Sequence, residues 1–241
     1  LETADKIMTY KLTVKTIAKR HGLYASFMPK PKYGMCGSGM HINMSLFNKE
    51  GQNIFVDEND KNGLSKEAYN FIAGLMKHMR SMTAIINPIV NSYKRLVPGY
   101  EAPTYIAWSA TNRSPLIRVP AARGLGTRVE LRSPDCATNP YLAIAVCLAA
   151  GLDGIKNNLQ PVDSIQRDIY SMTDEERDEA GIENLPKNLY EAIQEMRKSD
   201  FVKGVLGKEV FKKYIKAKEE ECMEYTSQVT DWEIDRYLGR I

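Results

Sequence analysis

Apolar side chains recur at helical spacing in three long stretches of the chain. The clearest stretch places the following residues on one face: Ala68, Ile72, Leu75, Met79, Met82 and Ile86. This spacing predicts an amphipathic helix over 65–86. The same kind of spacing predicts a helix over 5–21 and a more apolar one over about 140–152, where Pro140 takes the first-turn position that proline tolerates.

The segment 40–46 alternates strictly between apolar and polar residues, which predicts a strand with one buried face. Its polar face carries His41, Asn43 and Ser45, spaced about 7 Å apart because two strand residues advance by that distance. This row is either a solvated face or a ligand-binding face. The glycine-containing segment 37–39 just before it favours close approach of the backbone to a ligand.

A second alternating stretch, 127–132, turns Val129 and Leu131 to one side and three charged side chains to the other. The charged residues are Arg128, Glu130 and Arg132, and further arginines stand nearby at Arg95, Arg113, Arg118 and Arg123. Arginine binds carboxylate and phosphate in bidentate geometry, and glutamate and histidine are ligands for divalent metals. The pattern is typical either of an exposed strand with neutralised charges or of a site for an anionic substrate and a metal.

The remaining pattern predicts the fold class. Further short strands are expected at 24–28, 53–56, 104–109 and 116–119, and a polar loop at 91–95. Because hairpin-length links outnumber crossovers, we predict an α+β fold with a sheet of antiparallel strands, flanking helices and a helical C-terminal tail.

The chain becomes more charged and more helical after Gly154. Capping-box patterns stand at 173–176 and 230–233, and a long amphipathic helix is predicted from Phe211 to Val229. We therefore expect a sheet-and-helix core over 1–154 and a helical C-terminal region of the same domain over 155–241.

Composition excludes several classes of protein. The 33 basic and 30 acidic residues leave a net charge of +3 without a dense basic run, which argues against a nucleic-acid partner. The longest uncharged run, 136–152, is too short for a membrane span. The four cysteines form no C-x-x-C pair, so neither a disulfide framework nor a zinc site is indicated, and a cytoplasmic location fits best.

Several ordered segments resemble one family. They are Phe27-Met28-Pro29-Lys30-Pro31, Gly37-Ser38-Gly39-Met40-His41, the run 91–103, Asn112-Arg113-Ser114, the run 128–132, and Asn139-Pro140-Tyr141-Leu142. Together they resemble the bacterial type I glutamine synthetases, most of all the Gram-positive kind. The resemblance implies an ATP-dependent glutamate–ammonia ligase that makes glutamine through a γ-glutamyl phosphate, with Mg²⁺ or Mn²⁺ as cofactor and glutamate, ammonia and ATP as substrates.

The resemblance also implies roles for individual residues. His41 and Glu130 would ligate the metal. Glu101, on a flap over the intermediate, would be catalytic together with Arg113 and Arg118. Asn43, Ser45, Arg118 and Arg128 would bind ATP, while Gly37, Arg95 and Arg132 would hold glutamate.

Part of the family pattern is missing from this sequence. The family has an N-terminal β-domain and further metal-binding glutamates ahead of the point that corresponds to Leu1, so we expect the C-terminal part of the catalytic domain, inactive by itself. The full-length protein would be a homo-oligomer, as the family forms double-ring dodecamers.

Cys36 stands where the family usually has asparagine, beside the glutamate site. Two alternatives stay open: a γ-glutamyl–amine (polyamine) ligase of the same superfamily, and a non-catalytic homologue used in regulation or binding.

Overall fold

The computed structural model describes residues 1–112 and 114–241 as a mixture of helices and small sheets. The helices are α1 (Glu2–Arg20), α2 (Lys66–Ile86), α3 (Val90–Arg95), α4 (Pro140–Lys156), α5 (Asp174–Glu179), α6 (Leu189–Arg197), α7 (Asp200–Leu206), α8 (Lys208–Thr226) and α9 (Asp231–Tyr237), with 3₁₀ turns η1 (Gly124–Gly126) and η2 (Ile169–Ser171). The strands are β1 (Ile42–Met44), β2 (Tyr105–Ile106), β3 (Trp108–Ser109), β4 (Ile117–Arg118), β5 (Val129–Leu131) and β6 (Glu183–Asn184). The predicted α+β class is confirmed.

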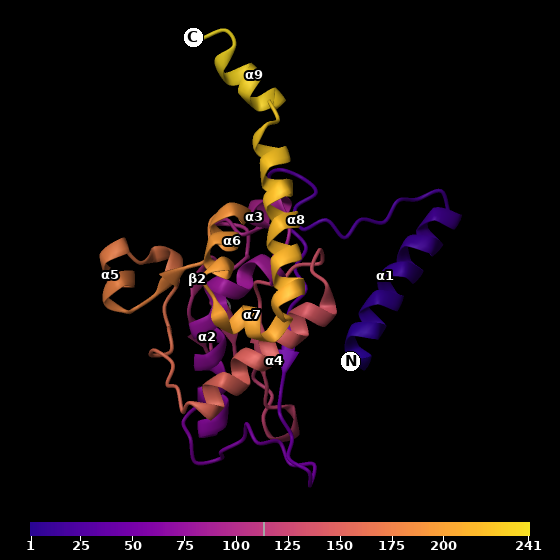
Figure 1. Cartoon of the computed structure of the whole chain (residues 1–241). Helices are drawn as coiled ribbons and strands as arrows, with labels where there is room; N and C mark the ends of the chain where they lie inside the picture. Colours follow the sequence, from indigo (N-terminus) through magenta and orange to yellow (C-terminus); the bar gives the residue numbers. More distant parts are fainter. Residues whose placement is uncertain (113) are drawn as a thin grey trace.

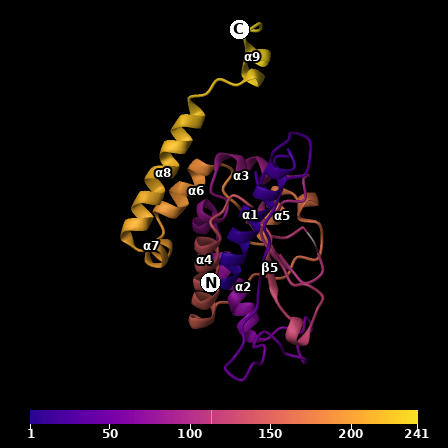
Figure 2. The same cartoon turned by 90° about the vertical axis from the view of Figure 1, so that its right-hand side faces the viewer.

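Helix α2 is the centre of the core, and it lies beside α4 (Figure 1). Its N-terminus is capped by Ser65, whose hydroxyl accepts a hydrogen bond from the amide of Ala68 at 3.2 Å, as capping predicts. All six residues of the predicted apolar stripe are fully buried. Helices α4, α6, α7 and α8 gather on one side, and β5 with its neighbouring loops lies on the other (Figure 2).

The backbones of α2 and α4 touch where they cross, and glycines make this possible. A Cβ atom on Gly154 would lie 2.0 Å from the carbonyl oxygen of Asn70, and one on Gly74 would lie 2.1 Å from that of Ala150. Neither atom could fit without moving a helix backbone. The closeness of the two central helices therefore depends on the absence of side chains at these positions.

Replacing Gly154 by alanine should destabilise the protein by about 1–3 kcal/mol, because the added methyl group forces the two helices apart. The matched control is Gly204→Ala in α7, where an added Cβ meets nothing within 4 Å. That change should stabilise by up to about 1 kcal/mol, since alanine favours the helix. Urea unfolding of both variants measures the difference, and equal effects of the two substitutions would contradict this account of the helix crossing.

A four-stranded sheet in the order β1-β5-β4-β3 packs its apolar face on this core. Ile42 lies opposite Leu131, which lies opposite Ile117, which lies opposite Trp108. The β1–β5 and β5–β4 pairs are antiparallel, as predicted, but β3 and β4 are parallel. The two strands run side by side in the same direction, with Trp108 opposite Ile117 and Ser109 opposite Arg118. The amide of Ile117 in β4 donates to the carbonyl of Ala107, just before β3, at 3.1 Å.

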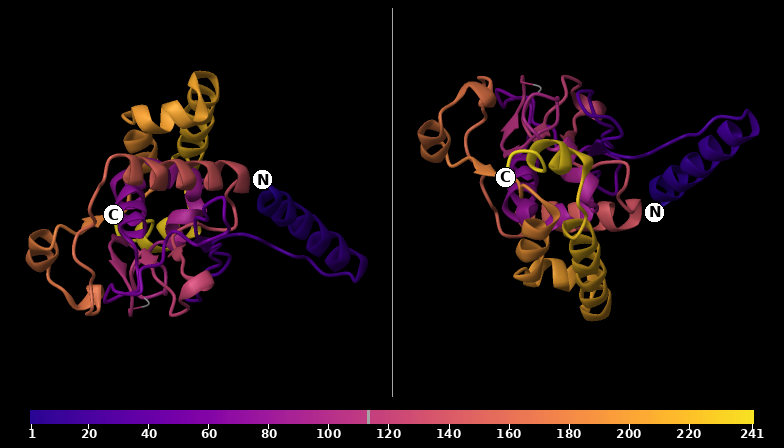
Figure 3. Two further views of the ribbon diagram at one scale, coloured as in Figure 1. Left: turned by 90° about the horizontal axis from the view of Figure 1, so that it is seen from below. Right: turned by 90° about the horizontal axis from the view of Figure 1, so that it is seen from above.

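Both ends of the chain extend away from this body. Helix α1 stands apart, joined to the body by an extended segment (Figure 3). It contacts α4 through the hydroxyl of Tyr141, which donates to the carboxylate of Asp5 at 2.5 Å. At the other end α9 projects beyond α8 (Figure 1). The capping boxes predicted at 173–176 and 230–233 are both present.

Three local predictions are wrong. The segment 24–28 is irregular rather than a strand, since it has no strand to pair with among the described residues, and Phe27 instead packs edge-on against Tyr10 of α1. The segment 91–95 is helical rather than a loop. Helix α3 has six residues, too few to display a helical period in the sequence. Its conformation is fixed by burial of Tyr93 and Arg95 against the body. The stretch 53–56, predicted as a strand, forms only isolated bridges.

No helix of the described chain is both long enough and apolar enough to cross a membrane.

A partly buried histidine joins three helices. The Nε2 atom of His78 on α2 lies 2.8 Å from a carboxylate oxygen of Asp153 on α4, which Lys77 also contacts at 3.0 Å. The imidazole stacks on the ring of Phe201 in α7, with 3.7 Å between centroids. Burial lowers the pKa of His78 below its ordinary value of 6.5 and outweighs the opposing effect of Asp153.

This arrangement predicts a loss of stability in mild acid. The unfolded chain binds the His78 proton at higher pH than the folded one, so stability falls as the pH drops below 6.5. His78→Gln, which cannot titrate, should reduce the loss in Tm between about pH 7.5 and pH 5.5. His21→Gln, at the exposed end of α1, is the control. An identical loss in wild type and His78→Gln would remove His78 from the pH response.

Candidate active site

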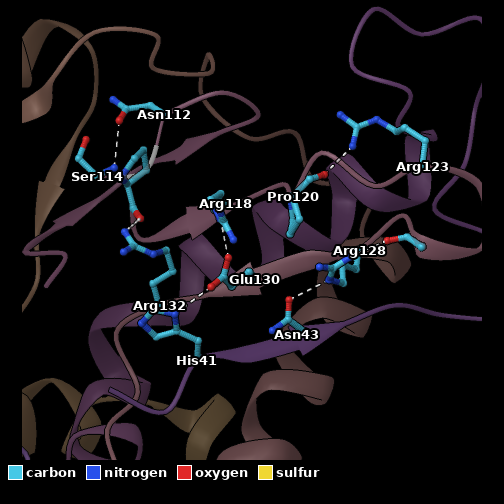
Figure 4. Close-up of polar contacts among 12 residues, drawn as sticks. His41, Asn43, Asn112, Ser114, Arg118, Pro120, Arg123, Arg128, Glu130 and Arg132 are labelled. Atoms are coloured by element: carbon cyan, nitrogen blue, oxygen red, sulfur yellow. Dashed lines mark hydrogen bonds and ion pairs between the residues drawn. The ribbon is translucent and has the colours of Figure 1, made fainter. Parts of the chain in front are cut away.

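The polar face of the four-stranded sheet collects most of the predicted site residues. Asn43 on β1 lies opposite Glu130 on β5, which lies opposite Arg118 on β4. His41 precedes Asn43 by two residues and so projects from the same face. Figure 4 shows His41 and Arg118 both directed at Glu130. The two alternating segments of the sequence therefore meet on one surface, as adjacent strands.

Glu130 is a buried carboxylate with a partner on each oxygen. Its Oε1 lies 2.8 Å from Nδ1 of His41, and its Oε2 accepts a hydrogen bond from Nε of Arg118 at 2.5 Å. The side chains of His41 and Arg118 are about a third exposed, at 35% and 33%. They cover the carboxylate while keeping one edge open to solvent, where a ligand can reach them.

The electrostatics keep Glu130 charged and His41 neutral. Burial raises the pKa of Glu130, but hydrogen bonds from Arg118 and His41 outweigh it, and the net pKa lies below the ordinary value. Burial lowers the pKa of His41, assisted by the charge of Arg132, against the opposing hydrogen bond to Glu130. At neutral pH, Nδ1 of His41 thus donates its hydrogen to Glu130, and the lone pair of Nε2 is available.

A neutral imidazole and an ionised carboxylate fit a divalent metal ion as two of its ligands. They are not a complete set. Within the chain that the structure describes, no group of three or more His, Cys, Asp or Glu side chains is placed to hold an ion. His41 and Glu130 therefore suit a shared site, in which water, a substrate or other protein groups supply the remaining ligands.

The far end of the same face carries a second polar pair. Nε of Arg128 donates to Oδ1 of Asn43 at 3.0 Å, and its Nη1 donates to the carbonyl of Gly126 at 3.0 Å. Ser45 is exposed beyond the end of β1. Asn43 is the cross-strand partner of Glu130, and Arg128 and Ser45 continue the polar face from this pair past the end of β1.

Arg95 and Gly37 pack against each other. Arg95 is buried, and its guanidinium donates to the carbonyls of Ser133 at 2.6 Å and of Arg132 at 3.1 Å. A Cβ on Gly37 would lie 2.5 Å from the carbonyl oxygen of Pro29 and 2.9 Å from Cγ of Arg95. Glycine is required here to let the segment pack on Arg95.

Arg132 opens onto a cavity of about 710 Å³ next to the Glu130 cluster. The cavity is lined by Pro98, Gly99, Glu101, Asn112, Ser114, Arg132, Asp168 and Tyr170. Arg132 is half-buried and donates weakly to the carbonyl of Pro115 at 3.4 Å. Glu101 is exposed on the loop that forms one rim. An arginine facing such a hollow suits a small carboxylate substrate.

The structure thus brings His41, Glu130 and Arg118 into direct contact and places Arg132 and Glu101 around one cavity. The predicted catalytic residue Arg113 lies outside the described residues. Sequence reasoning assigned no role to Asn112, Asp168 and Tyr170, which line this cavity. No periodic pattern marks these residues, since their partners lie far along the chain.

Comparisons with known proteins show the family. The sequence profile described as "Glutamine synthetase, catalytic domain" matches residues 1–237. The chain is 62% identical over 240 residues to a glutamine synthetase of Clostridium saccharobutylicum, covering 100% of this chain and 54% of that protein. It is 56% identical to one of Methanosarcina mazei, covering 99% and 53%, and 54% identical to one of Staphylococcus aureus, covering 97% and 52%. The resemblance to the Gram-positive kind is confirmed.

Solved structures give the same picture. One described as "Apo GmaS without ligand" superposes with a TM-score of 0.86 at 39% identity, covering 98% of this chain and 53% of the other. One described as "GmaS/ADP complex-Conformation 1" gives 0.87 at 38%, covering 98% and 54%. The chain spans about half the length of the relatives that it matches.

Proposed function

This chain belongs to the family of glutamine synthetase catalytic domains, and we propose that it is the C-terminal catalytic part of an ATP-dependent glutamate–ammonia ligase. Members of this family generally use ATP and divalent metal ions. The reaction forms glutamine in two steps: ATP phosphorylates the side chain of glutamate, and ammonia then displaces the phosphate. The full-length protein would work in the cytoplasm as a homo-oligomer.

One observation carries the proposal: an ionised carboxylate that is flanked by a neutral imidazole and an arginine on a single sheet face. Phosphoryl transfer needs positioning and charge stabilisation more than covalent chemistry. His41 and Glu130 would hold Mg²⁺ or Mn²⁺, which when bound would neutralise phosphate charge. Arg118, beside them, would face the transferring phosphate, with Arg113 in the same role. One structural relative is a complex with ADP, which supports a nucleotide site in this chain.

Substrate binding would divide along the sheet. Asn43, Ser45 and Arg128 would contact ATP at one end, and the fixed guanidinium of Arg128 would orient the nucleotide. At the other end Arg132 would clamp the glutamate carboxylate within the cavity, and Gly37 and Arg95 would help to hold glutamate. Glu101 would reach over the cavity from its rim and exclude water from the acyl phosphate.

The alternative of a ligase for larger amines has weaker support. The relatives that are 54–62% identical to this chain are all named glutamine synthetases. A non-catalytic homologue would have no physical need to keep a charged glutamate buried between an imidazole and a guanidinium, because such burial carries a desolvation cost.

The test compares the full-length protein with this 241-residue chain by itself. Each is given glutamate, ATP and Mg²⁺ with ammonia, with a polyamine, or with no amine, while glutamine and ADP are measured. We expect glutamine from the full-length protein with ammonia only, and no product from the isolated chain, because two metal ligands cannot fill a coordination shell of about six. Turnover with polyamine alone would favour the alternative, and no turnover with any amine would overturn the enzymatic proposal. Equal activity of both proteins would place the whole chemistry within these residues.

A further inference from the structure

The loop at the rim of the cavity, residues 98–103, has an unusual backbone. Glu101 adopts a positive φ of 58°, which is uncommon for a residue with a side chain. Such a conformation costs energy and persists only where the surroundings hold it. The segment 98–103, named the flap here, is therefore fixed by contacts on either side of Glu101.

The first contact is made by Lys30 on the N-terminal side of Glu101. Its ammonium group lies 3.6 Å from the ring centroid of Tyr100, a cation–π distance. Lys30 is buried, with 9% of the residue exposed, and it also donates to the carbonyl of Met35. Its backbone amide donates to Oδ1 of Asn91 at 2.8 Å. A buried lysine that is held at backbone and side chain is a fixed point for the ring of Tyr100.

The second contact is made by Tyr170 on the C-terminal side of Glu101. Its hydroxyl donates to the carbonyl of Ala102 at 2.8 Å. The ring packs against Tyr105 with 5.6 Å between centroids, and the amide of Tyr170 donates to Asp168 at 3.2 Å. Tyr170 is thus held by its own neighbours, and it lines the same cavity as Glu101 and Arg132.

We propose that Lys30 and Tyr170 are positioning residues that clamp the flap on both sides of Glu101 and keep that carboxylate over the cavity. Neither residue needs to touch the reacting atoms. Each holds one neighbour of Glu101, so that the strained backbone between them has a single conformation. The inference rests on the proposed ligase function, and it assigns these two residues to the protection of the intermediate.

The consequence of a loose flap follows from the chemistry of an acyl phosphate. In the productive step ammonia attacks the γ-carbonyl carbon, a C–N bond forms, the C–O bond to phosphate breaks, and inorganic phosphate leaves together with the proton lost from nitrogen. If water enters, its oxygen attacks the same carbon, the same C–O bond breaks, phosphate leaves and a proton is released, so glutamate is regenerated. ATP is then consumed without glutamine. The ratio of ADP to glutamine measures how well the flap excludes water.

Tyr170→Phe in the full-length protein tests the second contact, because it removes only the hydroxyl. Loss of one hydrogen bond of about 1 kcal/mol shifts the clamped-to-open ratio by about fivefold. We expect the ADP-to-glutamine ratio at low ammonia to rise at least about twofold. The control is Tyr214→Phe, which removes a similar bond to the carbonyl of Ala84 at 2.7 Å between α8 and α2. Tyr214→Phe should lower Tm about as much as Tyr170→Phe and leave the ADP-to-glutamine ratio unchanged.

Lys30→Met and Lys30→Arg test the first contact. Methionine keeps an apolar stem without the cation, so Lys30→Met should raise the ADP-to-glutamine ratio. Arginine keeps a cation over the ring of Tyr100, so Lys30→Arg should give the wild-type ratio. A wild-type ADP-to-glutamine ratio in both Tyr170→Phe and Lys30→Met would overturn the proposed clamp and leave the ligase function intact. Absence of glutamine formation by the wild type would overturn both.

Discussion

Replacing Glu130 by glutamine in the full-length protein should lower kcat/KM by about 100-fold or more, with little change in overall fold. The amide lacks the negative charge of the carboxylate that His41 and Arg118 contact, so a metal ion held as proposed would lose one ligand, and His41 would lose the contact that orients it. The loss should appear in binding as well as in activity. Millimolar Mn²⁺ should raise the Tm of the wild type and leave that of Glu130→Gln unchanged, since only a bound ligand stabilises the folded state.

A second carboxylate in the same molecule provides the control for this prediction. Asp153 is paired with His78 and Lys77 much as Glu130 is paired with His41 and Arg118, but it joins helices in the core. Asp153→Asn should lower Tm and leave activity and the Mn²⁺ response intact. A Glu130→Gln protein that keeps both activity and the Mn²⁺ response would remove Glu130 from the proposed metal site.

Replacing Arg132 by lysine should raise the KM for glutamate by about 10–100-fold and change kcat much less. Lysine offers a point charge where the guanidinium offers two parallel donors to a carboxylate. The loss of one charge-assisted hydrogen bond is worth about 1.5–3 kcal/mol, which corresponds to that range. Because the proposed contact would be made to bound substrate before and during the reaction, its loss should appear mainly in KM.

The matched change is Arg128→Lys at the opposite end of the sheet face. It should raise the KM for ATP and leave that for glutamate unaltered, because Arg128 pairs with Asn43 and does not line the cavity. Steady-state kinetics with each substrate varied in turn separates the two. An unchanged KM for glutamate together with an unchanged kcat in Arg132→Lys would exclude Arg132 from the substrate site.

The sequence by itself determined the features that depend on neighbouring residues. The stripe of α2 is readable because helical residues three and four apart share a face, and the capping boxes at Thr173 and Thr230 are complete within four residues. The alternation in 40–46 and 127–132 separated His41 and Glu130 from the core-facing residues, because strand side chains alternate with period two. The ordered motifs were enough to indicate the family, because each is a contiguous run of residues.

Only the tertiary structure decided which of these surfaces meet. The register that places Asn43 opposite Glu130, and Glu130 opposite Arg118, is set by packing of the apolar face on the core, since a one-residue slip would turn every side chain over. The helix at 90–95 and the irregular segment at 24–28 followed the partners available to them, against their local pattern.

The clamp on the flap is the plainest case of what the sequence could not supply. The hydroxyl of Tyr170 meets the carbonyl of Ala102 across 68 positions of sequence, and Lys30 meets Tyr100 across a similar distance. Periodicity reports only which residues share a face of one element. Contacts between distant segments depend on how all the elements pack together, and the chain fixes that arrangement through the sum of its buried surfaces rather than through any local signal.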